Sequence, residues 1–310
     1  MVMSTEKIPL LVICGPTGSG KSALAMELAR HYPLEIVAAD SRQVYRQMDI
    51  GTAKPGAADQ AAVPHHLIDV IDPDQEYSVA RYVETARQVI VRIHERQKLP
   101  CVVGGTGLYL RALLGGLADL PTGDDALRRT LHEQEIRQGE GSLHRELQRL
   151  DPQAAEQIHP RNIIRLVRAL EVCILTGRRF SRIKASHDFV DQAYRVVKLA
   201  PDWSRAELYA RIEARAQQML DAGLVAETQG IVDSYGDQIK ALQTLGYREV
   251  VRYLQGQIDA GQMLADIRKF TRQYAKKQLT WFRREPDLIW VDSHEKSDRV
   301  KTYIDPLYFQ

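Results

Sequence analysis

A phosphate-binding loop is the clearest chemical signal in the sequence. The segment GPTGSGKS, residues 15–22, fits the pattern G-x-x-x-x-G-K-[ST], in which a curled backbone directs several N–H groups at one anion. Lys21 adds a full positive charge, and the hydroxyl of Ser22 is the expected Mg²⁺ ligand. The loop therefore predicts a bound di- or triphosphate, without indicating what that phosphate chain is attached to.

Asp40 is the second residue placed to do chemistry. It ends the apolar run LEIVAAD, residues 34–40, which predicts a buried strand. Strand ends of this kind face the ligand in open α/β sheets, so Asp40 can bind Mg²⁺ or act as a general base; a turn or helix-capping aspartate is the alternative. The third strand, CVVGGTG, ends without the acid that an ATPase needs there to hold Mg²⁺. This absence argues against a plain NTPase.

Basic and aromatic side chains share a predicted helix near the carboxyl end. Residues 268–284 carry seven Lys and Arg and no Asp or Glu, interleaved with Phe270, Tyr274, Trp281 and Phe282. Such a helix suits a phosphate backbone with unstacked bases, and a solvated basic face opposite an aromatic core face is the alternative. The net charge of only +2 gives no argument of its own, so the class of partner depends on this distribution.

Two further groups of arginines recur at helical spacing. Arg161, Arg165 and Arg168 fall on one helical face, which adds support for a nucleic-acid substrate. Arg211 and Arg215 lie one turn apart, where an arginine near a P-loop can clamp a phosphate. Spacing alone favours a surface salt bridge for this second pair.

Alternating strand and helix patterns must position these residues. The first 115 residues predict βαβ units and so a parallel sheet, with a polar, Gly- and Pro-rich stretch over 41–77. From 124 to about 177 only helical periodicity is found. The segment 194–201 predicts a strand that returns to the sheet. Further elements are expected as helices at 204–220, 224–234 and 262–284 and a last strand at 287–292. We therefore expect an α/β core from 1–117 and 192–310, and a helical insertion domain from 118–191.

Composition sets the broad class. The chain has 310 residues, of which 44% are hydrophobic and 26% charged, as in a globular protein with a sizeable core. Its three cysteines are odd in number and far apart, which favours buried thiols in a reducing compartment over disulfides or a zinc site. No apolar stretch approaches the ~20 residues of a membrane span, and the first apolar run is too short for a signal peptide. The sequence predicts a cytoplasmic protein, with a monomer as the default.

Taken together, the motifs resemble those of one family, the tRNA dimethylallyltransferases, also called tRNA isopentenyltransferases. The most diagnostic stretch is DSRQVYRQMDIGTAKP, in which Gln47 stands where the family often has Gly. A zinc-finger extension typical of eukaryotic members is absent, so the resemblance is to the bacterial type. The other matching stretches, between residues 15 and 284, are GPTGSGKS, VPHHLID, VVGGTGLYLRALL, IIRLVRALEV, RIEARAQQMLDAGLVAE, LGYRE and YAKKQLTWFRR.

The resemblance implies a fold and a reaction. The fold is a P-loop NTPase-like parallel sheet flanked by helices, with an all-helical inserted subdomain. The reaction moves a dimethylallyl group from dimethylallyl diphosphate to the exocyclic N6 amine of adenosine 37 in tRNA, beside the anticodon. Diphosphate leaves, and Mg²⁺ assists. On this interpretation the loop holds the leaving group of an alkyl transfer, and no phosphorus centre is attacked.

The resemblance also implies roles for residues. Asp40 is similar to the general base acting on the amine, Arg215 to the arginine that holds the diphosphate, and Ser22 to the metal ligand. The implied catalytic residues are Asp40, Thr17, Lys21 and Arg215. The implied diphosphate site is Gly15, Pro16, Thr17, Gly18, Ser19, Gly20, Lys21 and Ser22. The implied tRNA-binding residues are Asp40, Ser41, Arg42, Gln43, Thr106, Arg128, Ile164, Arg165, Leu166, Val167, Arg168, Gln243, Thr244, Leu245, Gly246, Tyr247 and Arg248.

Three other functions fit parts of the pattern. An adenylate isopentenyltransferase, acting on free AMP, ADP or ATP, would share the loop and Asp40, but the helical insertion and basic helices favour tRNA. A small-molecule P-loop kinase would bind ATP and transfer a phosphoryl group, and the missing strand-end acid argues against it. A nucleic-acid-binding P-loop protein without transferase chemistry is the third.

Overall fold

The computed structural model describes residues 7–117, 120–185, 193–292 and 297–308. The chain forms two compact units. The first comprises Met1–Leu114 and Gln192–Gln310, and the second comprises Gly115–Asp191. The described residues contain no helix with the length and apolarity of a transmembrane span.

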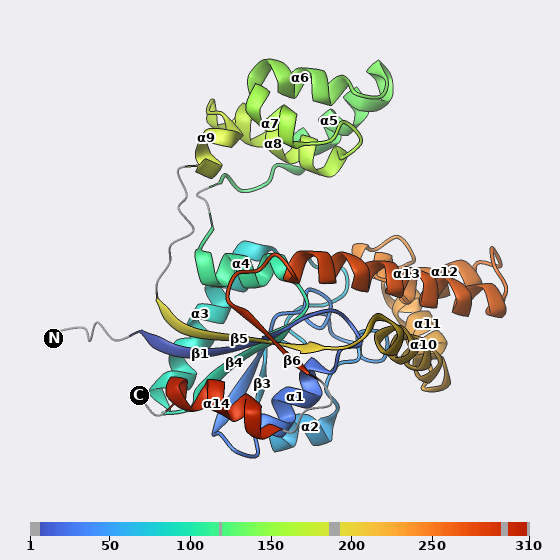
Figure 1. The fold of residues 1–310 in the computed structure, drawn as a ribbon. Helices are drawn as coiled ribbons and strands as arrows, with labels where there is room; N and C mark the ends of the chain where they lie inside the picture. Colours follow the sequence, from blue (N-terminus) through green and yellow to red (C-terminus); the bar gives the residue numbers. More distant parts are fainter. Residues whose placement is uncertain (1–6, 118–119, 186–192, 293–296, 309–310) are drawn as a thin grey trace. The chain divides into compact units, whose positions relative to one another are not determined.

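A six-stranded parallel sheet forms the centre of the first unit, which confirms the predicted fold class (Figure 1). The strand order is β3-β2-β4-β1-β5-β6, so β1 is central and pairs with β4 and β5. Five of its seven residues are buried, as expected for a strand covered on both faces. The strands are β1 (Ile8–Cys14), β2 (Leu34–Ala38), β3 (His65–His66), β4 (Leu99–Gly104), β5 (Tyr194–Asp202) and β6 (Leu288–Asp292).

Helices cover both faces of the sheet (Figure 1). On one face, α1 (Lys21–Leu28) and α14 (Ser297–Tyr308) pack through Leu28, Val300 and Ile304 onto β1 and its neighbours, with α2 (Ala57–Ala62) nearby. On the other face lie α3 (Val79–Glu95) and α4 (Gly107–Gly115), where Tyr82 and Tyr109 stack with ring centroids 4.1 Å apart.

A helical lobe continues the first unit beyond the carboxyl ends of the strands (Figure 1). It has a core of its own, in which Leu224, Ile231 and Tyr247 are buried. Val44 and Met48, from the segment that follows β2, are buried in the same core, so this segment is part of the lobe. The elements are α10 (Arg205–Asp221), α11 (Leu224–Tyr235), the 3₁₀ helix η1 (Lys240–Gln243), α12 (Tyr247–Leu254) and α13 (Ala260–Phe282).

The second unit is built from helices throughout its described residues. Leu131, Leu143, Leu147 and Leu170 are buried in its core. Its helices are α5 (Asp125–Gln138), α6 (Ser142–Leu150), α7 (Pro152–Gln157), α8 (Ile163–Thr176) and α9 (Phe180–Ala185).

Several short elements were not expected from the sequence. The polar stretch 41–77 contains α2 and β3, and β3 is a two-residue strand set only by its pairing with Ile36 and Val37. The strand predicted over 34–40 ends at Ala38, so Asp40 lies in the loop beyond it. The helices α12 and α14 were also missed. Helices this short are stabilised mainly by packing, which local patterns do not encode.

The cysteines follow the prediction. All three are free and buried. Burial raises the pKa of the Cys14 thiol to about 12, so it stays protonated and inert at neutral pH.

Candidate active site

The loop after β1 has the geometry of an anion site. Gly15, Gly18 and Gly20 have φ values of 135°, 80° and 85°, which side-chain-bearing residues rarely adopt. They allow α1 to begin at Lys21, so the N–H groups of its first turn, which have no intrahelical partner, face the loop. The hydroxyl of Ser19 is buried and has no hydrogen-bond partner. A phosphate oxygen bound in the loop would satisfy it.

Lys21 lies inside this loop. Its Nζ donates to the carbonyl oxygen of Pro16 at 2.7 Å. The pKa of Lys21 is lowered to about 8, mainly by burial and also by the charge of Arg215, against the opposing effect of the Asp40 carboxylate. The electrostatic influence of both groups on Lys21 indicates that an acid and two cations share one site.

Helix α10 holds the loop from the side. Arg215 donates from an Nη atom to Thr17 Oγ1 at 3.5 Å, and burial lowers the pKa of its guanidinium. One turn earlier, Arg211 donates from Nε to the Gly18 carbonyl oxygen at 2.9 Å. Its guanidinium also lies over the ring of Trp203, 4.3 Å from the centroid. Among the residues that the structure describes, neither arginine has the salt-bridge partner that their spacing favoured, because both face the phosphate-binding loop.

Asp40 is held where the ends of β2 and β4 meet. Its Oδ1 accepts from the Arg42 N–H at 2.9 Å, and the Ser41 N–H donates to Thr106 Oγ1 at 3.1 Å. The Thr106 N–H donates in turn to the Ala39 carbonyl oxygen at 3.2 Å. A Cβ on Gly104 would lie 2.1 Å from that carbonyl oxygen, so glycine is required for the close approach.

Gln278 on α13 joins the two loops. Its Oε1 accepts from the Thr17 N–H at 2.9 Å, and its Nε2 donates to the Gly105 carbonyl oxygen at 2.9 Å. The sequence analysis did not identify this residue. The available signal was a polar side chain on the buried face of α13, in register with Ala275 and Phe282.

Tyr274 lies one turn before Gln278 on the same helix face. Burial raises the pKa of its phenol, and the charge of Asp40 raises it further while that of Arg42 lowers it. The ring therefore lies near both groups, yet 40% of the residue is exposed. A partly exposed aromatic side chain is thus within electrostatic reach of Asp40.

A carboxylate from α11 anchors the segment that follows Asp40. Glu227 accepts the N–H groups of Asp49, Ile50 and Gly51 at 3.1, 2.8 and 3.2 Å. It also accepts the hydroxyl of Tyr247 at 2.5 Å. Three backbone hydrogen bonds therefore join this segment to the helical lobe.

The residues assigned to tRNA binding in the second unit differ in exposure. Ile164 is 80% exposed and Arg165 is also exposed, whereas Leu166 and Val167 are buried in the core of that unit. Arg168 contacts the buried carboxylate of Glu171 and donates to the Pro121 carbonyl oxygen at 2.9 Å. Ile164 and Arg165 are therefore the side chains of this helical stretch that a ligand can reach most fully.

Arg128 belongs to the same ion-pair cluster as Arg168. Its Nε lies 2.8 Å from Glu171 Oε1, and an Nη atom lies 3.2 Å from Asp125 Oδ1. Hydrogen bonds and ion pairs hold the pKa of the Glu171 carboxyl low despite its burial. Arg128 and Arg168 thus neutralise the buried carboxylate of Glu171, with or without a bound ligand.

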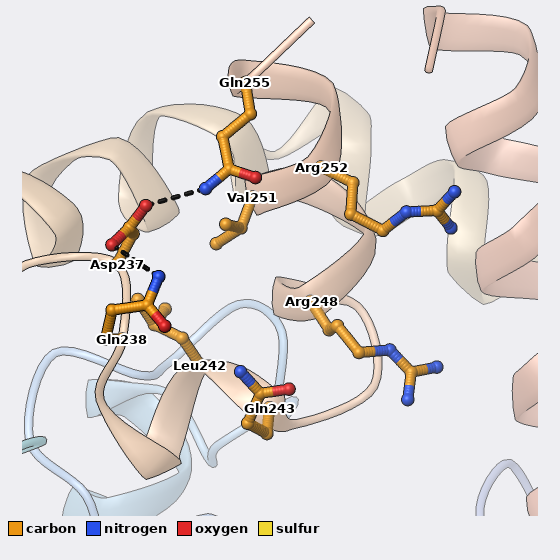
Figure 2. A pocket seen from close by; sticks show the side chains of 8 residues that line it. All are labelled: Asp237, Gln238, Leu242, Gln243, Arg248, Val251, Arg252 and Gln255. Carbon is orange, nitrogen blue, oxygen red and sulfur yellow. Dashed lines mark hydrogen bonds between the residues drawn. The ribbon is translucent and has the colours of Figure 1, made fainter. Parts of the chain in front are cut away.

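The residues from Gln243 to Arg248 also differ in exposure. Thr244, Gly246 and Tyr247 are buried, and Gln243 and Arg248 reach the surface. Gln243 and Arg248 also line a cavity on the helical lobe (Figure 2).

The protein-family model described as IPP transferase matches residues 43–285, which is most of the chain. The chain belongs to the IPP transferase family. A second model, isopentenyl transferase, matches residues 8–67, which include the phosphate-binding loop and Asp40.

Individual members of this family are similar over nearly the whole chain. A protein named tRNA dimethylallyltransferase 1 from Syntrophotalea carbinolica is 46% identical over 98% of this chain and 97% of its own. A tRNA dimethylallyltransferase from Geobacter metallireducens is 46% identical over 98% of both chains.

Two solved structures are also similar to this chain over nearly its whole length. The tRNA isopentenylpyrophosphate transferase of Bacillus halodurans matches with a TM-score of 0.71 and 37% identity, covering 98% of this chain and 95% of its own. A eukaryotic dimethylallyltransferase described as acting on tRNA matches with a TM-score of 0.81 and 26% identity, covering 96% of this chain and 76% of its own.

Proposed function

We propose that this protein transfers a dimethylallyl group from dimethylallyl diphosphate to the N6 amine of adenosine 37 in tRNA, next to the anticodon. The observation that carries the proposal is the shared site of Lys21, Arg215 and Asp40 at the phosphate-binding loop. Membership of the IPP transferase family and relatives named tRNA dimethylallyltransferase support it.

The leaving group is bound by the loop. When the allylic carbon–oxygen bond breaks, the electron pair and the negative charge pass to the diphosphate. The first-turn N–H groups of α1, the Ser19 hydroxyl, Lys21 and Arg215 are the groups that stabilise this charge. Thr17 takes part through its contact with Arg215.

Asp40 acts on the nucleophile. The adenine amine is a weak nucleophile because its lone pair is delocalised into the ring. As nitrogen bonds to the allylic carbon, Asp40 takes one of its two protons, so the product is a neutral secondary amine. The turn in which the Arg42 N–H binds Oδ1 fixes the orientation of the carboxylate.

A divalent ion, proposed as Mg²⁺, fits the residues around the loop. Ser22 is exposed in the first turn of α1, where its hydroxyl can supply one oxygen ligand. No group of three metal-binding side chains occurs within the described ranges, so the remaining ligands would be diphosphate oxygens and water. The bound ion would neutralise charge on the leaving diphosphate.

The tRNA is proposed to contact both units. Exposed or half-buried candidates are Arg42, Gln43, Arg165, Gln243 and Arg248. The target base must leave the anticodon stack, at a cost of a few kcal/mol that phosphate contacts can offset. We also propose a cytoplasmic monomer, and the three free, buried thiols suit a reducing compartment.

One assay tests the function against its main alternative. The protein is incubated with labelled dimethylallyl diphosphate, Mg²⁺ and either an unmodified anticodon stem-loop or free AMP, and the nucleosides are separated after digestion. We expect prenylated adenosine from the stem-loop and little from AMP. Equal or faster transfer to AMP would instead assign an adenylate isopentenyltransferase.

A further inference from the structure

Two side chains, one on α10 and one just before it, bind carbonyl oxygens of the phosphate-binding loop. The indole N–H of Trp203 donates to the Ser19 carbonyl oxygen at 2.8 Å. Arg211 Nε donates to the Gly18 carbonyl oxygen at 2.9 Å. The two side chains also contact each other, because the Arg211 guanidinium lies over the Trp203 ring, 4.3 Å from its centroid. A stacked pair of side chains therefore binds two successive carbonyl groups of the loop.

The sequence places this pair beside the loop. β5 pairs with β1 and ends at Asp202, so the chain leaves the sheet next to the loop that follows β1 (Figure 1). Ser204 then starts α10 with a capping box that includes Glu207, which fixes where the helix begins. Ile212 lies so close to the loop that a Cβ on Gly18 would be 3.0 Å from its Cγ1. The loop and the first turns of α10 are thus in direct contact.

The two carbonyl contacts also orient N–H groups of the loop. In a planar trans peptide the C=O and N–H bonds point in opposite directions. Binding the carbonyl oxygens of Gly18 and Ser19 therefore directs the N–H groups of Ser19 and Gly20 away from Arg211 and the indole. The Ser19 N–H lies 3.4 Å from the Pro16 carbonyl oxygen, a long hydrogen bond that a phosphate oxygen can replace.

N–H groups that are oriented in advance matter most where charge develops. When the carbon–oxygen bond of dimethylallyl diphosphate breaks, N–H groups that already point at the diphosphate need no reorganisation. Arg211 is exposed, whereas Arg215 is half-buried and contacts Thr17. Arg215 is therefore the arginine placed to contact the diphosphate itself, and Arg211 is expected to act through the backbone of the loop.

We propose that Arg211 and Trp203 are positioning residues for the leaving diphosphate. By binding two carbonyl oxygens of the loop, they turn the N–H groups of Ser19 and Gly20 toward the anion. This role rests on the proposed function, because the diphosphate concerned is the one that dimethylallyl transfer releases.

Three variants separate the hydrogen bonds from the charge. The Nε2 of glutamine is as many bonds from Cα as the Nε of arginine, so Arg211→Gln keeps a donor for the Gly18 carbonyl oxygen and removes the charge. Arg211→Met has the same length and no donor, and both residues are good helix formers. Trp203→Phe keeps a ring beneath Arg211 and removes the indole N–H.

The test measures the affinity of each variant for 3-methylbutyl diphosphate, a saturated analogue of the prenyl substrate, by titration calorimetry with Mg²⁺. We expect Arg211→Met and Trp203→Phe to bind it about 10-fold more weakly, which is about 1.4 kcal/mol. Arg211→Gln should bind it with nearly the affinity of the wild type. The KM for dimethylallyl diphosphate should rise in the two weak variants, and the KM for RNA should not.

Arg205→Met is the matched control. Arg205 is an exposed arginine on the same helix, and its guanidinium lies over the Tyr209 ring, 5.1 Å from the centroid. The variant therefore removes an arginine that is stacked on an aromatic ring, as Arg211 is, and should change neither the affinity for the analogue nor either KM.

The outcomes decide between a backbone effect and its alternatives. If Arg211→Gln binds as weakly as Arg211→Met, the charge matters rather than the carbonyl contact, and the positioning role is wrong. Unchanged affinity in Arg211→Met, or an equal rise in both KM values, also overturns it. If Arg211→Met alone binds weakly, the assignment of Trp203 is wrong. All these results leave the proposed function standing, whereas a wild type that does not bind the analogue overturns both.

Discussion

Replacing Gln278 by methionine should loosen the phosphate-binding loop. The side chain makes two hydrogen bonds, to the Thr17 N–H and the Gly105 carbonyl oxygen, both at 2.9 Å. Methionine has nearly the same length and helix propensity as glutamine, so the change removes the bonds while keeping the shape. The expected effect is therefore electrostatic in origin rather than a packing defect.

The magnitude follows from the burial of the two partners. Gly105 is buried, so its carbonyl loses a partner that water does not easily replace, at about 1–3 kcal/mol. Thr17 is half-buried and water can reach its N–H, so that loss is about 1 kcal/mol. Burying the methionine side chain returns about 1 kcal/mol. The unfolding free energy should fall by roughly 1–3 kcal/mol.

The assay is urea unfolding together with titration of a saturated analogue, 3-methylbutyl diphosphate, which binds without reacting. Gln273→Met is the matched control, because Gln273 lies on the exposed face of the same helix. We expect lower stability and weaker analogue binding for the Gln278 variant alone. If both variants unfold within about 0.5 kcal/mol of the wild type, the ordinary spread for surface changes, the bridge does not stabilise the loop.

Three further predictions concern charge. The pKa of Lys21 is lowered from 10.5 to about 8, so the side chain is protonated below that pH and loses its charge above it. The affinity for 3-methylbutyl diphosphate should therefore fall as the pH rises through 8. Lys21→Arg should flatten this dependence of affinity on pH. An unchanged profile in the variant would show that another group titrates. Asp40→Asn should reduce transfer by about 10²–10⁴-fold with RNA affinity retained, and near-normal turnover would remove its assignment as base. Arg165→Ala should lower the slope of log RNA affinity against log salt concentration by about 0.7–0.9 without affecting stability. Arg168→Ala should instead destabilise the second unit, because the buried carboxylate of Glu171 loses a partner. Equal salt slopes for Arg165→Ala and the wild type would place Arg165 away from the phosphates.

Local patterns were enough to predict the sheet and the phosphate-binding loop. A strand, a glycine-rich turn and a helix follow one another within residues 8–28, and each part is specified by its own sequence. Asp40 could be placed at the sheet edge for the same reason, although β2 ends at Ala38 rather than at Asp40 itself.

The residues that hold the site in place by hydrogen bonds could not be predicted, because they come from distant parts of the chain. Gln278 binds Thr17 across 261 residues, and Glu227 binds Ile50 across 177. Spacing shows that Arg168 lies on a helix face, and only tertiary packing shows that it is paired with Glu171. Gln47 has a φ of 64°, a conformation that glycine adopts more readily than glutamine, so only the folded backbone shows why glycine would suit this position.

The central position of β1 has a consequence for synthesis on the ribosome. One neighbour, β4, ends at Gly104, but the other, β5, begins only at Tyr194. Between these points the emerging chain carries an apolar strand with one row of backbone groups unpaired, the kind of edge on which chains aggregate. The residues made during that interval include the second unit, which buries a core of its own. If this unit folds before β5 emerges, it replaces a long flexible loop between β4 and β5 with a compact one, which lowers the entropy cost of pairing β5 with β1.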